Sequence, residues 1–168
     1  HADPHPGNFM LLEGGVLGLL DCGMVGRIDE STRELFEELL LLLLQGDAEE
    51  LADALLRAGS APADVDRAGF RSDVSDLIVE YGTQSLEDFD LGGALDQLSD
   101  IIRRHHILMP SAASLLLKTL VMLEGTSRLL SPSFSLSEVI EPFKERLVHE
   151  RMNPQRWMRR LQRSAADM

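Results

Sequence analysis

The chain has 168 residues, 44% of them hydrophobic and 26% charged, as is usual for a folded globular domain. Its formal charge of −12 argues against nucleic acid as a partner, because phosphate contacts need clustered Lys and Arg. The single cysteine, Cys22, excludes an internal disulfide and is consistent with a reducing cytoplasm. A start on His1 instead of methionine indicates a fragment of a longer chain.

The first elements expected are two short strands joined by a tight turn. Apolar runs at 9–12 and 16–20 flank Glu13-Gly14-Gly15, and Gly-Gly is typical of hairpin turns because both residues accept a positive φ. The two ends of a hairpin lie side by side. The pattern therefore brings Asn8, just before the first strand, close to Asp21, just after the second.

From Asp29 onward the leucine spacing predicts helices, and the low aromatic content of 5% also favours them. Asp29 or Ser31 caps the first helix, which runs to Gln45; the six-leucine run at 39–44 is too short to span a membrane and is expected in the core. The fifth helix, opened by Pro110 at its first turn, is apolar on most sides and is expected at the centre of a bundle. The further helices are expected at 48–57, 62–82, 91–106, 111–130, 137–151 and 154–163.

One group of polar residues, near the start of the chain, has the pattern of a catalytic site. The chain opens His1-x-Asp3-x-x-x-x-Asn8, and Asp21-x-Gly23 follows thirteen residues after Asn8. Protein-kinase catalytic loops read H-x-D-x-x-x-x-N and are followed by D-F-G. Phosphoryl transfer needs a carboxylate beside the attacking hydroxyl and hard oxygen ligands for Mg²⁺. Asp3 suits the first role, Asn8 and Asp21 suit the second, and Gly23 allows a sharp turn. An ordinary polar loop is the competing interpretation of the first eight residues alone.

The segments HADPHPGN and LLDCGMVGRID, separated by the hairpin, resemble the UbiB family of atypical kinases (the ADCK-type, ubiquinone-associated kinase-like proteins). The resemblance is strongest over residues 1–29 and continues through PSAASLLLKTLVMLEGTSRLLSPSF. It implies catalytic roles for Asp3 and His5, with His5 near the transferred phosphate. It also implies Mg²⁺ and ATP as cofactors, with Asn8 and Asp21 as metal ligands. His1, Asn8, Asp21 and Gly23 then form the cofactor-binding set, with His1 supporting the loop backbone; Cys22 replaces the family's phenylalanine.

The resemblance implies the C-terminal lobe of a protein-kinase-like fold, mainly α. A hairpin at 1–29 carries the catalytic and metal loops, and a helical lobe spans 30–168. The nucleotide-binding lobe is absent, so we expect the fragment alone to be inactive and the missing lobe of the same chain to be a partner. No Ala-Pro-Glu segment follows Arg27, which favours a small or lipid-like acceptor, or ATP hydrolysis itself, over a protein substrate. The family link is to quinone or isoprenoid-lipid metabolism at the cytoplasmic face of the inner membrane, with quinone precursors as partners.

Three alternatives stay open from the sequence. Aminoglycoside and choline phosphotransferases, whose loops read H-G-D-x-H-x-x-N, share Asp3, His5, Asn8 and Asp21, although Asp3-Pro4 favours the UbiB interpretation. A non-catalytic Mg·nucleotide-binding regulatory module needs only the metal ligands. A helical scaffold with a polar loop needs none of these residues.

Weaker patterns concern the later helices. His105-His106 is interpreted as the capped end of a helix and not as a metal site, and Glu124 is placed on a polar edge of the fifth helix. The basic, amphipathic stretch at 152–163 is expected either to pack on residues outside the fragment or to contact an anionic membrane.

Overall fold

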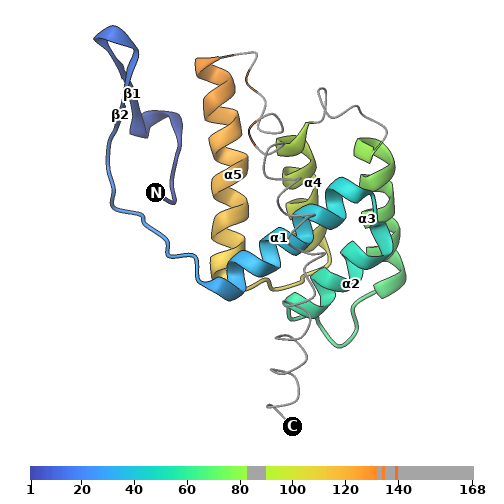
Figure 1. The fold of residues 1–168 in the computed structure, drawn as a ribbon. Helices are drawn as coiled ribbons and strands as arrows, with labels where there is room; N and C mark the ends of the chain where they lie inside the picture. Colours follow the sequence, from blue (N-terminus) through green and yellow to red (C-terminus); the bar gives the residue numbers. More distant parts are fainter. Residues whose placement is uncertain (83–89, 132–133, 135–138, 140–168) are drawn as a thin grey trace, which may run out of the picture.

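The computed structural model describes residues 1–82, 90–131, 134 and 139, and these form a two-stranded hairpin followed by helices (Figure 1). The helices expected at 137–151 and 154–163, including the basic stretch at 152–163, lie outside the described residues. The prediction of a mainly helical fold with one short hairpin is confirmed.

Strand β1 (Phe9–Leu12) pairs antiparallel with strand β2 (Val16–Leu19), so that Phe9 lies opposite Leu19 and Leu12 opposite Val16. The turn between them places Gly14 at φ 79° and Gly15 at φ 76°, the left-handed region that glycine adopts without steric cost. The Gly-Gly pair therefore closes the hairpin as the sequence predicts.

Helix α1 (Glu30–Gln45) follows the hairpin after an extended segment and is capped by Asp29, whose carboxylate accepts from the Thr32 amide at 2.8 Å. Gly46, at φ 70°, ends it. The next elements are helix α2 (Ala48–Ala58), helix α3 (Arg67–Gly82), helix α4 (Leu91–Arg104) and helix α5 (Ser111–Leu130).

The predicted start of α3 at residue 62 is wrong by five residues. Pro62 begins a turn, in which the Val65 amide donates to its carbonyl at 3.2 Å, and Asp66 then caps the helix by accepting from the Gly69 amide at 2.9 Å. Pro110 is likewise the residue before α5 and not its first helical one: its ψ of 137° is extended. A side-chain cap therefore sets the start of α3, whereas α5 begins directly after the extended Pro110 without a side-chain cap.

The core lies among α1, α2, α3 and α4. The leucine run of α1 is buried from Leu39 to Leu43, and all of these leucines except Leu41 belong to this core. The prediction that α5 stands at the centre is wrong. Figure 1 shows α5 between the hairpin and the other helices, and its last residues Leu129 and Leu130 are 72% and 53% exposed. Helix α5 is apolar on several sides because it packs on the bundle along one side and receives the N-terminal loop along another.

Candidate functional site

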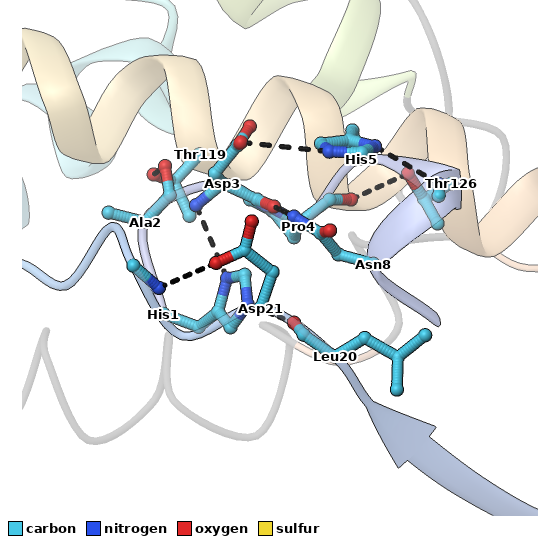
Figure 2. A network of polar contacts seen from close by, with 12 residues as sticks. His1, Ala2, Asp3, Pro4, His5, Asn8, Leu20, Asp21, Thr119 and Thr126 are labelled. Atoms are coloured by element: carbon cyan, nitrogen blue, oxygen red, sulfur yellow. Dashed lines mark hydrogen bonds and ion pairs between the residues drawn. The ribbon is translucent and has the colours of Figure 1, made fainter. Parts of the chain in front are cut away.

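The site is built where the first eight residues meet the turn that follows β2 (Figure 2). The Leu20 amide donates to the Asn8 carbonyl at 2.8 Å, and the Ala2 amide donates to the Met24 carbonyl at 3.0 Å. The His1 ring adds a third link, with its Nε2 3.2 Å from the Leu20 carbonyl. These bonds hold the 1–8 loop against the 20–24 segment, so the two polar motifs of the sequence share one end of the hairpin.

Asp3 lies between two histidines. Its amide donates to His1 Nδ1 at 3.3 Å, and its carboxylate Oδ2 is 3.7 Å from His5 Nε2. His5 Nδ1 accepts from the Gly7 amide at 3.0 Å, which leaves its Nε2 to carry the proton that faces Asp3. The Asp3 side chain remains 31% exposed, so a hydroxyl from outside can reach this carboxylate. The arrangement suits a proton acceptor with a neighbouring group that bears positive charge when protonated.

Asn8 ends the short 3₁₀ turn Pro6–Asn8 and is 6% exposed. Its side-chain nitrogen donates to the Asp3 carbonyl at 2.9 Å. Because the amide nitrogen is committed to the loop, the orientation of the carboxamide is fixed and its oxygen keeps its lone pairs for another partner. A single side chain thus closes the loop around Asp3 and presents a hard oxygen.

Asp21 adopts a left-handed backbone conformation with φ 43°, which is uncommon for a residue that has a side chain. Its Oδ1 accepts from the Gly23 amide at 3.0 Å. Residues 22 and 23 form a turn, as expected beside Gly23, but the left-handed residue is Asp21 and not the glycine. The glycine is needed for space, since a Cβ at position 23 would lie 2.9 Å from Asp21 Oδ1.

The donor set fits a magnesium ion that is shared with a polyphosphate. Mg²⁺ takes oxygen ligands and usually binds through one or two protein groups plus water and substrate phosphates. Asn8 and Asp21 offer one carboxamide oxygen and one carboxylate on neighbouring segments. Within the described ranges, no group of three or more His, Cys, Asp or Glu side chains is arranged to hold a metal ion. One carboxamide oxygen and one carboxylate match the kind and number of protein ligands that Mg²⁺ usually takes.

Two threonines of α5 hold the loop, and the sequence analysis missed both. Thr126, 3% exposed, donates its hydroxyl to the Pro4 carbonyl at 2.7 Å. Thr119 Oγ1 lies 3.3 Å from the Ala2 carbonyl and 2.7 Å from the Leu115 carbonyl. The two contacts flank Asp3 on both sides (Figure 2). Hydroxyl residues seven apart on an apolar helix share one face, and that spacing was the available sequence signal.

The expectation that Glu124 lies on a polar edge is wrong. Glu124 is 3% exposed, pairs with Arg128 at 2.8 Å, and packs so closely on α4 that a Cβ at Gly92 would overlap its Oε2. Burial raises the pKa of this carboxyl, and Arg128 opposes the rise. The apolar residues around position 124 gave no sign that a carboxylate would face a glycine.

His105 caps the end of α4, as the sequence analysis interpreted it. Its ring lies 2.9 Å from the carboxylate of Asp73 and edge-on to Phe70 with centroids 5.3 Å apart. The hydrogen bond to His105, together with Arg104, lowers the pKa of Asp73. The pair ties α3 to the end of α4 and has no part in the site.

Comparison with known proteins finds two family models on this chain. Residues 1–55 match the ABC1 atypical kinase-like domain, and residues 74–135 match the UbiB helical domain. No solved structure matches significantly.

Among similar proteins are an uncharacterized protein of Synechocystis sp. (35% identity), an uncharacterized chloroplastic aarF domain-containing protein kinase of Arabidopsis thaliana (28%) and a probable protein kinase UbiB of Pseudomonas aeruginosa (28%). The alignments cover 74%, 92% and 96% of this chain but only 31%, 22% and 31% of these relatives. The chain thus spans less than a third of the length of each relative. In the part of the chain that the structure describes, no helix is long and apolar enough to cross a membrane.

Proposed function

Since this chain belongs to the UbiB family of atypical kinases, we propose that it supplies the catalytic loop and the metal ligands of an ATP-dependent kinase or ATPase. The observation that carries the proposal is the hydrogen-bonded junction between the 1–8 loop and the 20–24 segment. That junction holds Asp3, Asn8 and the segment that carries Asp21 at one end of the hairpin. Phosphoryl transfer from Mg·ATP requires a carboxylate and two oxygen ligands, the roles that we propose for these three residues.

In the proposed reaction, Asp3 accepts or orients the proton of the attacking hydroxyl or water. The loop carbonyls that Thr119 and Thr126 hold keep the Asp3 backbone in place while this happens. His5 Nε2 faces the Asp3 carboxylate, and a proton on this nitrogen would offset negative charge that develops beside Asp3 on the transferred phosphoryl group. A magnesium ion, when bound with ATP, supplies charge neutralisation between the phosphates.

Asn8 and Asp21 are the proposed ligands of that ion. The Asn8 carboxamide is oriented by its bond to the Asp3 carbonyl, and the Asp21 carboxylate by its bond to the Gly23 amide. Both ligands therefore have their rotamers fixed before the metal arrives, which reduces the entropy lost on binding.

The hairpin is the proposed contact surface for a nucleotide-binding lobe. Its side chains are apolar yet exposed on both faces of the sheet, with Leu11 at 67%, Val16 at 56% and Leu19 at 56%. A two-stranded sheet of this kind is marginal in water unless something packs on it. Without that lobe the chain holds Mg·ATP by only part of a clamp, so we expect the 168-residue chain alone to show no Mg²⁺-dependent ATP hydrolysis.

The test separates catalysis from binding in a protein that joins this chain to a nucleotide-binding lobe. Asp3→Asn should lower kcat by a factor of about 10²–10⁴ with Mg·ATP affinity retained. Asp21→Asn should weaken Mg·ATP binding by about tenfold or more. Asp64→Asn is the matched control, because Asp64 is exposed and far along the chain in the segment before α3.

The outcomes distinguish the competing functions. Unchanged function in Asp3→Asn, together with loss in Asp21→Asn, would favour a non-catalytic Mg·nucleotide-binding module. No effect of either substitution would leave only a helical scaffold. Turnover of an aminoglycoside or choline in preference to lipid-like acceptors would favour the small-molecule phosphotransferases.

We further propose, on the strength of the family relationship, that the acceptor or the coupled process belongs to quinone or isoprenoid-lipid metabolism. The corresponding location is the cytoplasmic side of the inner membrane, with the 152–163 stretch as the peripheral contact. Flotation of the chain with anionic liposomes, with and without residues 152–168, tests the membrane contact: equal flotation of both forms would exclude that stretch.

A further inference from the structure

A pocket of about 340 Å³ lies beside the catalytic loop, on the flank formed by the segment after Asp21 and the start of α5. Ile28, Ala112, Leu115 and Leu116 give it apolar walls. Its polar groups come from His1, Arg27, Ser111 and Thr119. Its volume falls in the range of small-molecule sites, which combine mainly apolar walls with a few polar groups. Neither Asn8 nor Asp21 lines it, so it is distinct from the proposed metal site.

Arg27 is the unusual member of this lining. The arginines of α1, α2, α4 and α5 all pair with carboxylates, as expected in a chain with 28 acidic and 16 basic residues. Arg27 makes no ion pair or hydrogen bond to any other described residue. A guanidinium without a carboxylate partner, in so acidic a chain, is available for an anion brought by a ligand.

We propose that this pocket binds a small amphiphilic anion, whose apolar part lies on Leu115 and Leu116 and whose anionic group pairs with Arg27. The apolar part of the ligand follows from the apolar walls of the pocket, because covering them removes apolar surface from water. The anionic group follows from Arg27, which has no ion-pair partner among the described residues, and from the absence of a carboxylate among the described lining residues. The site stands independently of the proposed kinase activity.

The pocket shares His1, Ala2 and Thr119 with the contacts that hold the 1–8 loop in place. Ala2, whose carbonyl lies 3.3 Å from Thr119 Oγ1, lines it together with Thr119 itself. A ligand in the pocket therefore contacts the support of the loop that carries Asp3. Gly26 also lines the pocket. A Cβ atom at position 26 would lie 3.2 Å from a methyl carbon of Leu115, so a larger residue there would narrow the pocket.

Hexyl phosphate is a suitable probe for the 168-residue chain, with inorganic phosphate, hexanol and hexylammonium as comparisons. Calorimetric titration should show hexyl phosphate binding at least tenfold more tightly than each of the three, because each comparison lacks the tail, lacks the charge or reverses it. Amide chemical-shift changes in NMR spectra should centre on Gly26, Arg27 and Ala112.

Two variants test the anionic and the apolar parts of the proposed site separately. Arg27→Gln should weaken hexyl phosphate binding about tenfold, as loss of a charge-assisted contact implies. The matched control is Arg67→Gln, since Arg67 is also exposed, also makes no ion pair among the described residues, and lies at the start of α3. Ala112→Leu, a substitution that suits a helix, should block binding by filling the pocket.

Several results would overturn the proposal. Equal binding of hexanol or hexylammonium would exclude anion selectivity, and equal binding of inorganic phosphate would exclude the apolar part. Unchanged affinity in both Arg27→Gln and Ala112→Leu would place binding elsewhere. Shift changes centred on the apolar interior, at Leu98 or Ala113, would do the same.

Discussion

The helical bundle and the hairpin end of this molecule are held by different forces. In the bundle, Leu51, Leu55 and Phe70 are fully buried, and the stability comes from apolar area removed from water. At the hairpin end the leucines of both strands are exposed, and the 1–8 loop is held by directed hydrogen bonds. The molecule is thus a hydrophobic platform that carries a hydrogen-bonded functional loop.

Helix α5 joins the two regions. It packs on α4 and α1 along one side and holds the loop through Thr119 and Thr126 along another. Substitutions in the bundle should therefore alter global stability, whereas substitutions at the α5–loop contact should alter the position of Asp3 first. This separation of roles is what the following variants test.

The largest effect is expected for Phe70→Ala in α3. The ring is fully buried and lies against His105, so its loss leaves a cavity and should lower the free energy of unfolding by about 3–5 kcal/mol. That is a large share of the 5–15 kcal/mol typical of a domain. Urea denaturation followed by circular dichroism measures it.

The matched control is Leu11→Ala in β1, where the side chain is 67% exposed. Its removal should change the free energy of unfolding by less than about 0.5 kcal/mol. Equal losses in the two variants would show that the hairpin is part of the cooperative core and would break the comparison.

Thr126→Val should have the next largest effect, and it should be local. The substitution keeps the shape of the side chain but leaves the buried Pro4 carbonyl without its donor, a cost of about 1–3 kcal/mol. Hydrogen exchange should quicken at the amides of Ala2, Asp3 and Asn8 by more than in the bundle. Thr126→Ser, which keeps the hydroxyl, should restore protection; failure of this rescue would mean that packing, not the hydrogen bond, holds the loop.

Much of the fold could be predicted from sequence because local rules decide it. The Gly-Gly turn, the Asp29 cap and the end of the first helix at Gln45 are each set by local conformational preferences, and all three lie where the pattern placed them. The motif spacing likewise placed Asn8 beside the segment that carries Asp21, because a hairpin brings its own ends together.

The errors come from interactions between distant segments. An amphipathic pattern does not predict which side of α5 packs on the other helices and which side contacts the 1–8 loop. Thr119 and Ala2, which meet at that contact, are 117 residues apart in the chain. Glu124 was misplaced for the same reason, since its burial depends on a glycine in another helix. At the candidate site, the left-handed residue beside the turn is Asp21 and not the neighbouring glycine, and such strained residues are commonly found at functional sites.

Glu124→Gln should change how the stability of the helical bundle depends on pH, and should thereby sharpen the distinction between the bundle and the hairpin end. Burial raises the pKa of Glu124 in the folded chain above its usual value of 4.5. The folded state then binds the proton more tightly than the unfolded one, so stability falls as the pH rises from 4.5 through the raised pKa. The glutamine variant should lack this fall, as thermal midpoints from pH 4 to 8 would show. Glu13→Gln, at the exposed hairpin tip, is the control and should leave the fall in stability with rising pH unchanged.

The smallest effect is expected at the edge of the bundle, for Asp73→Asn. Its hydrogen bond with His105, assisted by Arg104, lowers the Asp73 pKa below its usual value of 3.8. The stabilisation is therefore present above pH 3.8 and is lost as the pH falls through the lowered pKa. Below that pKa the variant and the original chain should have the same thermal midpoint. Asp76→Asn, exposed on the same helix, is the control. A difference that persists undiminished at pH 2.5 would show that the carboxylate contributes by packing, and the electrostatic link between α3 and α4 would have to be abandoned.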